Sequence, residues 1–336
     1  MTLRRAFALS LAVAAALWFA SASPATPGEA MGIALEGFPY PYPVHFLPVS
    51  LEGEDLCLAY MDVPPVGSST GRTVVLLHGR NFPSSYWEPT INALAGAGYR
   101  VVAPDQIGFG KSSKPGFAYS FDAMARVTLA LIDSLGIARF DLVGHSMGGM
   151  LAVRMARAYG ARIDHLVLYS PIGLEDYRFY APPMTDEQLA EHERALTADA
   201  YRKQLMTNYA ISLPSTAIEP FVQLREQIRE SGEYPRWLKS FVNSYQMIYT
   251  QPVAHEIPLI DRPTLFIMGT NDHNAPGRAL APPELRDKMG QNAALAQSLA
   301  AHMSNAKVVI FEGVGHLAHL EATQRFNETL LDFLGK

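Results

Sequence analysis

The chain has 336 residues, of which 49% are hydrophobic and 18% are charged, a globular composition long enough for one domain with a sizeable insertion. Its formal net charge is −5 and no run of Lys and Arg follows the first few residues, which argues against nucleic acid as a partner, because phosphate binding needs a basic face. The single cysteine, Cys57, excludes an internal disulfide and a cysteine-based metal site.

The first 22 residues predict a secretory signal peptide. Arg4 and Arg5 precede an apolar run over residues 6–20, and small residues follow. Residues 20–22 (Ala-Ser-Ala) are the favoured cleavage site, and residues 28–30 (Gly-Glu-Ala) are a weaker alternative. An uncleaved anchor is the less favoured interpretation, because the run is shorter than the ~20 residues that a membrane-spanning helix needs. We therefore expect a periplasmic or secreted protein with no stable membrane span after cleavage.

Short apolar segments alternate with helical patterns along the first half of the chain. Residues 23–48 read as an extended lead-in and residues 49–62 as an early strand or hairpin, in which Cys57 is expected to be buried. The alternation that follows indicates a mostly parallel sheet covered on both faces. We expect strands at residues 73–77, 100–103, 141–143 and 165–169, and helices at residues 88–97, 120–135 and 148–159.

The alternation stops near Gly173 and resumes near residue 263. The pattern between is helical and rich in aromatic residues, and residues 185–188 (Thr-Asp-Glu-Gln) have the form of a capping box. The predicted architecture is an α/β core of residues 49–173 and 258–336, with about eight strands, and a helical cap of residues 174–257 over the carboxyl edge of the sheet. In the second part of the core we expect strands at 263–268 and 307–311 and helices at about 283–302 and 321–333.

Residues 144–148 (Gly-His-Ser-Met-Gly) fit the pattern Gly-x-Ser-x-Gly between a predicted strand and a predicted helix. A serine on so tight a turn needs small residues two positions before and after it, so that strand and helix can approach. The turn lifts the hydroxyl out of the sheet and points the positive end of the next helix at it. The pattern therefore predicts Ser146 as a nucleophile.

A serine hydroxyl needs a base that is itself held by a third group. In chains with this motif the acid and then the histidine follow the serine. Asp272 and His316 each come just after a predicted strand and are the favoured acid and base. Glu175 and Asp176 are alternative positions for the acid, and His273 and His319 are alternatives for the base, with His319 also open to a surface or capping role.

The backbone N–H groups of Arg80 and Met147 are the expected donors to an oxyanion. Met147 directly follows the nucleophile, and Arg80 lies in the loop after the first long strand. We expect His78 to shape this loop and His145 to pack beside the site. Asn81 is open to two roles, as a donor to the substrate or as a residue that holds the loop.

The Gly-Lys-Ser at residues 110–112 does not form a phosphate loop, because Asp105 stands where that motif needs a glycine. A turn after a strand is the expected structure there. Neither His-Glu-x-x-His nor Cys-x-x-Cys occurs, so the sequence predicts no metal and no cofactor.

Together, these residues resemble the α/β-hydrolase superfamily, fold family 1. The resemblance covers roughly residues 51–334 and is carried by four stretches: residues 78–79 (His-Gly), residues 103–112, residues 144–149 and residues 315–316 (Gly-His). It implies a serine-nucleophile hydrolase with a triad of Ser146, Asp272 and His316, and it does not specify the substrate.

Departures from related groups narrow the expected activity. Haloalkane dehalogenases and related epoxide hydrolases carry Asp where this chain has Ser146, many ring-cleavage-product hydrolases have further glycines in the loop of residues 78–81, and proline iminopeptidases usually have Gly-Gly-Ser-Trp-Gly at the nucleophile. By elimination the expected activity is that of a carboxylesterase acting on a small-molecule ester. Carbon–carbon bond hydrolysis, perhydrolysis and a non-enzymatic ligand-binding module are the alternatives.

Overall fold

The computed structural model describes residues 30–335. The predicted signal peptide, residues 1–22, lies outside the described residues, as does the start of the lead-in. Within the described range no helix combines the length and the apolar character needed to cross a membrane. Residues 30–43 form turns without a helix or strand, and the first strand begins at Val44, earlier than expected.

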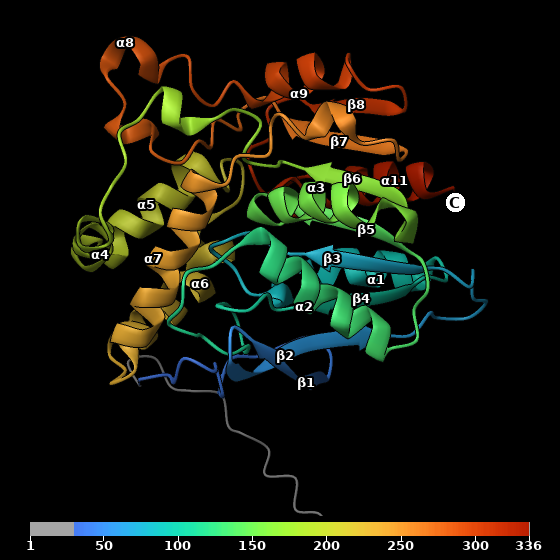
Figure 1. Ribbon diagram of the computed structural model, residues 1–336, viewed down its shortest axis with the longest axis horizontal. Coiled ribbons are helices and arrows are strands. Elements are labelled where there is room, and N and C mark those ends of the chain that lie inside the picture. The colour runs from blue at the N-terminus through green and yellow to red at the C-terminus, as the bar shows by residue number, and fades with distance from the viewer. Residues whose placement is uncertain (1–29, 336) are drawn as a thin grey trace, which may run out of the picture.

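Eight strands of residues 30–335 form one sheet in the order β1-β2-β4-β3-β5-β6-β7-β8 (Figure 1). The pairs β1–β2 and β2–β4 are antiparallel and all other pairs are parallel, which confirms the expected mostly parallel sheet. The strands are β1 (Val44–Leu51), β2 (Glu54–Val63), β3 (Thr73–Leu77), β4 (Arg100–Pro104), β5 (Phe140–His145), β6 (Ile163–Tyr169), β7 (Thr264–Gly269) and β8 (Ala306–Phe311).

The central strands and the edge hairpin differ in burial. Every residue of β3, β5 and β7 is buried, as expected for strands that helices cover on both faces. In β2 the neighbours Leu56 and Leu58 are buried, whereas Cys57 between them is exposed. The prediction of a buried Cys57 was therefore wrong: alternation along β2, the inner strand of the edge hairpin, points its side chain to the exposed face.

Helices cover both faces of the sheet (Figure 1). Residues of α2, α3 and α9 share one apolar core with the sheet, and residues of α1 and α11 share the other. The helices outside the β6–β7 segment are α1 (Glu88–Gly96), α2 (Phe121–Ser134), α3 (Met147–Tyr159), α8 (Pro283–Arg286), α9 (Asn292–Ala300), α10 (Ala318–Glu321) and α11 (Thr323–Leu334).

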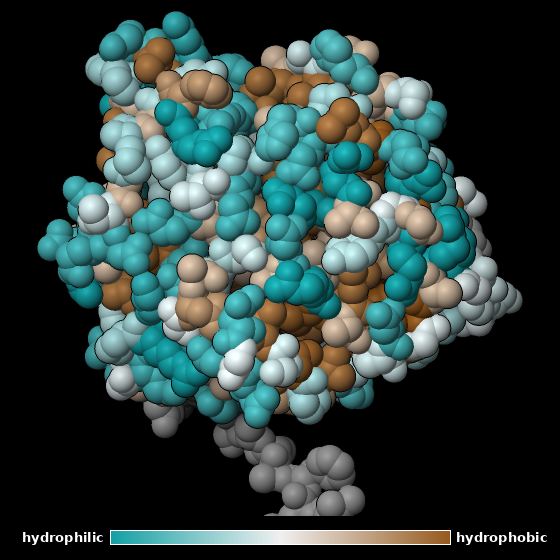
Figure 2. Space-filling view, viewed as in Figure 1, coloured by the Kyte–Doolittle hydropathy of each residue, from teal (hydrophilic) through white to brown (hydrophobic). Residues whose placement is uncertain are grey.

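The segment between β6 and β7 is helical and stands at the carboxyl edge of the sheet (Figure 1). Its α-helices are α4 (Asp186–Ala195), α5 (Ala198–Asn208), α6 (Ser215–Arg229) and α7 (Tyr234–Thr250). The Thr185 side chain and the Gln188 side chain form the expected capping box at the start of α4. The face of this segment that is seen in Figure 2 is largely hydrophilic. Leu189 of α4 is buried in an apolar cluster with Leu238 and Val242 of α7.

One predicted helix is split in two. The expected helix at about 283–302 is α8 and α9, with a break that contains Gly290. Gly290 has φ 73°, and a Cβ on it would lie 2.5 Å from the carbonyl oxygen of His273. Only glycine meets both conditions without strain, and a helix cannot continue through this conformation.

Candidate active site

Ser146 stands on a tight turn between β5 and α3. Its backbone has φ 56° and ψ −118°, a positive φ that non-glycine residues rarely adopt. A Cβ added to Gly144 would lie 2.3 Å from the carbonyl oxygen of Gly148, and one added to Gly148 would lie 2.4 Å from the carbonyl oxygen of Leu77. Both glycines are therefore needed for the close approach of β3, β5 and α3 that holds this turn.

Asp272 and His316 follow β7 and β8, and the structure brings them together. Nδ1 of His316 donates to Oδ2 of Asp272 at 2.9 Å, and both side chains are buried. Oδ1 of Asp272 accepts the backbone N–H of Asn274 at 3.1 Å and lies 3.5 Å from the side-chain nitrogen of Asn292. Nε2 of His316 is buried and makes no hydrogen bond to any residue between 30 and 335. The ring is thus fixed at Nδ1, and Nε2 is the nitrogen that a general base would use.

A chain of hydrogen bonds joins the loop after β3 to the loop that carries His316. The N–H of Gly79 donates to the Tyr86 hydroxyl at 3.1 Å, and this hydroxyl donates to Nδ1 of His145 at 2.8 Å. Nε2 of His145 then donates to the carbonyl oxygen of His316 at 3.0 Å. Burial, helped by the neighbouring histidines, lowers the pKa of His145 well below its usual value, so the ring stays neutral and can accept at one nitrogen and donate at the other.

The alternative acids have other partners. Glu175 accepts the backbone N–H of Gly290 at 2.8 Å and so fixes the break between α8 and α9. Asp176 pairs with Arg178, two residues further on, at 2.6 Å. Of the three candidate acids, Asp272 is therefore the one whose carboxylate contacts a histidine.

The alternative bases are placed elsewhere too. Nδ1 of His273 donates to the carbonyl oxygen of Gly290 at 3.0 Å. His319 is fully buried rather than at the surface, with its Nδ1 3.0 Å from the hydroxyl of Tyr169. Burial lowers the pKa of His319 to about 3, so its ring is neutral near pH 7.

The loop after β3 passes beside the nucleophile. A Cβ added to Gly79 would lie 3.1 Å from the Cβ of Ser146. His78 holds this loop: its Nδ1 donates to the carbonyl oxygen of Gly79 at 2.6 Å, and its Nε2 accepts the N–H of Gln106 at 2.9 Å. Met147 is the first residue of α3, so its N–H has no acceptor within the helix. That the N–H groups of Met147 and Arg80 bind an oxyanion stays a prediction.

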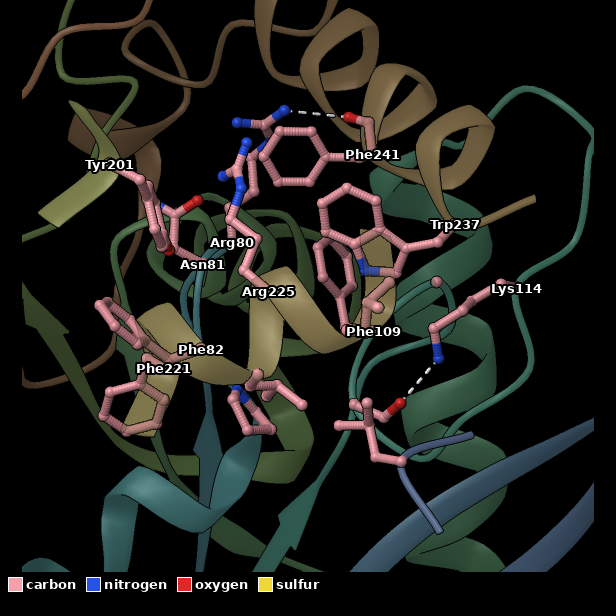
Figure 3. Close-up of a pocket in the computed structure, with 16 residues that line it drawn as sticks. Arg80, Asn81, Phe82, Phe109, Lys114, Tyr201, Phe221, Arg225, Trp237 and Phe241 are labelled. Atoms are coloured by element: carbon pink, nitrogen blue, oxygen red, sulfur yellow. Dashed lines mark hydrogen bonds between the residues drawn. The ribbon is translucent and has the colours of Figure 1, made fainter. Parts of the chain in front are cut away.

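Ser146 opens on a cavity of about 520 Å³ between the sheet edge and the helical segment. Residues of α4, α5 and α7 line it, and Asn81 holds the segment by donating to the Tyr209 hydroxyl at 2.8 Å. A smaller cavity of about 60 Å³ shares several lining residues with it, among them Arg80 and Phe241 (Figure 3). The charged lining of the larger cavity comprises one carboxylate, Glu193, and the guanidinium groups of Arg80, Arg225, Arg278 and Arg286. His192 and His273 also line it.

The Gly-Lys-Ser segment lies on a turn after β4. Asp105 holds this turn, because its Oδ2 accepts the N–H of Lys111 at 2.8 Å and its Oδ1 accepts the N–H of Ser84 at 2.8 Å. Among residues 30–335 no cluster of His, Cys, Asp and Glu side chains could hold a metal ion.

Comparison with known proteins places this geometry in a family. The model of the alpha/beta hydrolase family matches residues 74–329. The chain belongs to the alpha/beta hydrolase family. A structure described as a probable hydrolytic enzyme of Pseudomonas aeruginosa PAO1 superposes with a TM-score of 0.89 at 38% identity, covering 93% of this chain and 100% of that one.

Two curated relatives of this alpha/beta hydrolase carry names for reactions. The chain is 31% identical over 280 residues to a 2-hydroxy-6-oxononadienedioate/2-hydroxy-6-oxononatrienedioate hydrolase of Paraburkholderia phymatum, covering 79% of this chain and 87% of the relative. It is 30% identical over 275 residues to a 2-hydroxy-6-oxo-6-phenylhexa-2,4-dienoate hydrolase of Burkholderia cepacia, covering 79% and 88%.

Several residues of this alpha/beta hydrolase site carry no sequence signal. Tyr86 bridges Gly79 and His145, as described above, and the carbonyl oxygen of Tyr209 accepts the N–H of His316 at 2.9 Å. Glu321 accepts the N–H of Gly315 at 3.1 Å, and so braces the loop that carries the histidine. In each of these contacts one partner, Tyr86, Tyr209 or Glu321, lies outside the recognised motifs, so the motifs alone could not reveal it.

Proposed function

We propose that this alpha/beta hydrolase cleaves a carbon–carbon bond in a small molecule of the 2-hydroxy-6-oxo-dienoate kind, with Ser146 as nucleophile. The observation that carries the proposal is the lining of the Ser146 cavity, with four arginines and one glutamate in a chain of net charge −5. Such a lining favours an anionic substrate. The curated relatives are named for dienoates, which are carboxylates.

In the proposed reaction the substrate first isomerises: the proton of its C2 hydroxyl moves to C5, and C2 becomes a ketone. Ser146 Oγ attacks the carbonyl carbon C6 while His316 Nε2 takes the serine proton, and the N–H groups of Arg80 and Met147 bind the oxyanion. The C5–C6 bond then breaks, and the leaving fragment, whose negative charge is spread to the C2 oxygen, takes the proton from His316.

Water completes the proposed reaction. His316 Nε2 removes a proton from a water molecule, which attacks the acyl carbon and releases the second carboxylic acid and the Ser146 hydroxyl. Asp272 keeps the His316 ring oriented through Nδ1 and stabilises the imidazolium that forms in each half-reaction.

A carboxylic ester is the second candidate substrate. The same residues would attack an ester carbonyl, and the loop with one glycine between His78 and Arg80 favoured this activity in the sequence. The names of the relatives support carbon–carbon hydrolysis instead. The lack of further glycines in residues 78–81 is therefore a weak reason to prefer an esterase.

The test supplies the purified protein with 2-hydroxy-6-oxo-6-phenylhexa-2,4-dienoate and, separately, with p-nitrophenyl butyrate. We expect the dienoate to give benzoate with a kcat/KM at least 10-fold above that of the ester, and Ser146→Ala to lower kcat by about 10⁴-fold or more. Turnover of the ester alone would establish the second candidate. An absence of both activities, with no labelling of Ser146 by a fluorophosphonate, would identify a binding module.

We also propose that the protein is exported, on the basis of residues 1–22. Expression with the native N-terminus, followed by N-terminal sequencing of the periplasmic or secreted fraction, tests this. A mature protein that begins at Ser23 is expected, and an intact Met1 in a cytoplasmic fraction would contradict it.

A further inference from the structure

The guanidinium of Arg80 is held rigidly inside the Ser146 cavity. Its Nε donates to Oγ of Ser244 at 2.9 Å, and its Nη2 donates to the carbonyl oxygen of Phe241 at 3.0 Å. The group also stacks on the Phe241 ring, with Cζ 3.5 Å from the ring centroid (Figure 3). These contacts fix the plane and the direction of the guanidinium.

Arg80 has no ion-pair partner among residues 30–335, although it is partly buried. The one carboxylate in the cavity lining, Glu193, pairs with Arg225, and both of those side chains are buried. Figure 3 shows the guanidinium groups of Arg80 and Arg225 close together beside the ring of Phe241. One carboxylate therefore faces two guanidinium groups, which leaves an excess positive charge in this part of the cavity.

The free donors of Arg80 have the geometry that binds a carboxylate. A guanidinium carries five N–H donors, and two of those on Arg80 are used by Ser244 and Phe241. The remaining donors lie on the Nη atoms, where paired N–H groups match the two oxygens of a carboxylate. A second buried donor, Nε of Arg225, is without a hydrogen-bond partner among the described residues.

We infer that the Arg80 guanidinium binds a carboxylate of the substrate and thereby sets a preference for anionic substrates at Ser146. The inference deepens the proposed function and rests on it in so far as Ser146 acts on a molecule in this cavity. The position is suited to this role, because the backbone of Arg80 is an expected oxyanion donor and its side chain reaches into the same cavity. One residue would thus align both the reacting carbonyl and the distant carboxylate.

A purely structural role for Arg80 would have a different signature. In that case Arg80 would only fasten the loop after β3 to α7 through Ser244 and Phe241. Removing the side chain would then lower the rates for charged and neutral substrates by the same factor. The ratio of the two rates therefore separates substrate binding from loop support.

The experiment compares two p-nitrophenyl esters of equal acyl length, the hydrogen glutarate with its free carboxylate and the neutral valerate. We expect the native protein to prefer the glutarate in kcat/KM. Arg80→Met should reduce the glutarate-to-valerate ratio by about 30-fold, the loss typical of a hydrogen bond to a charged group. Arg80→Lys, which keeps the charge, should give an intermediate ratio. Arg126→Gln, on the exposed side of α2 beside Glu52, should leave the ratio unchanged.

An unchanged ratio in Arg80→Met would overturn the inference, as would a native preference for the valerate. Should Arg80→Met not fold, monomethyl glutarate and dimethyl glutarate are compared on the native protein as competitors of fluorophosphonate labelling at Ser146. Stronger protection by the anion supports the inference, and equal protection contradicts it. Neither readout needs cleavage of a dienoate, so a failure of the proposed function is seen separately.

Discussion

The two sides of the Ser146 cavity are built by different kinds of interaction. One side, the sheet wall, consists of Ser146, Asp272 and His316 at the carboxyl ends of β5, β7 and β8. The other, the helical wall, consists of the cavity-lining residues of α4 to α7, such as Glu193 and Phe241. In the sheet wall, backbone groups hold the Asp272–His316 pair, because Asp272 accepts the N–H of Asn274 and the carbonyl oxygen of His316 accepts from His145. In the helical wall, side chains are held by other side chains, as in the pair of Glu193 with Arg225.

This difference suggests separate roles for the two walls, with the reaction at the sheet wall and the choice of substrate at the helical wall. Parallel strands end at the same edge of a sheet, so three loops meet there whatever the rest of the chain contains. The pairing of Glu193 with Arg225 instead joins α4 to α6 and depends on two particular side chains. We expect changes in the sheet wall to reduce turnover, and changes in the helical wall to affect stability or substrate choice.

The largest effect is expected from Asp272→Asn. An asparagine at this position can donate to Nδ1 of His316 and so favour the tautomer that has its proton on Nε2, which cannot accept a proton from Ser146. We expect kcat to fall by about 10³- to 10⁴-fold with little change in thermal stability. Steady-state kinetics with whichever substrate is turned over, together with a thermal melt, provide the measurement.

Asp176→Asn is the matched control for Asp272→Asn. Asp176 is the alternative acid from the sequence, and it pairs with the exposed Arg178. Its replacement is expected to leave kcat within twofold of the native value. A large loss of kcat in Asp176→Asn, with native activity in Asp272→Asn, would show that the acid is Asp176 and that its assignment to Asp272 is wrong.

A smaller effect, on stability rather than on turnover, is expected from Glu193→Gln in the helical wall. The change leaves Arg225 buried without a counter-charge, and losing one partner of a buried ion pair costs about 3 kcal/mol or more. The free energy of unfolding, measured by urea denaturation, should fall by that amount. Glu187→Gln is the control, because its pair with Arg194 at the surface of the same helix is exposed. Equal stability of both variants would show that the helical wall does not depend on this pair.

Much of the fold could be predicted because its signals are local. The continuous apolar runs of β3 and β7 and the Ser120 cap of α2 are each readable within a few residues. The two features that the sequence predicted wrongly depend on neighbours that are distant in the sequence. The break at Gly290 is imposed by contacts with Glu175 and His273, and the exposure of Cys57 follows from its place in an edge hairpin.

The candidate site divides in the same way. Ser146, Asp272 and His316 could be chosen from the sequence because each follows a strand, and the sheet topology brings strand ends together. Tyr86 and Tyr209 could not, since each contacts the site through a hydroxyl or carbonyl group that any tyrosine, or any residue, carries. The positive charge of the cavity could not be predicted from the sequence either, because its arginines come from segments that are far apart in the chain.

The smallest effect concerns His319, the neutral histidine beside the sheet wall. Its folded pKa of about 3 lies below the ordinary value of 6.5, so between these values the unfolded chain binds the extra proton. Its contribution to stability is therefore complete above pH 6.5 and is lost as the pH falls from 6.5 towards 3. At pH 5 this histidine alone costs about 2 kcal/mol relative to pH 7.5, because each pKa unit corresponds to about 1.4 kcal/mol.

His319→Phe removes this titration while keeping an aromatic ring among Tyr86, Trp87 and Phe326. The free energy of unfolding, measured by urea denaturation at pH 7.5 and pH 5, should fall by about 2 kcal/mol less in the variant than in the native protein. His145 also has a lowered pKa and remains in both proteins, so the comparison isolates His319. His302→Phe, at an exposed site in the turn after α9, is the control and should follow the native curve. An equal fall in the free energy of unfolding in His319→Phe and in the native protein would contradict the lowered pKa. It would mean that the His319 ring takes up its proton in the folded state, so that the aromatic rings around it tolerate a charge.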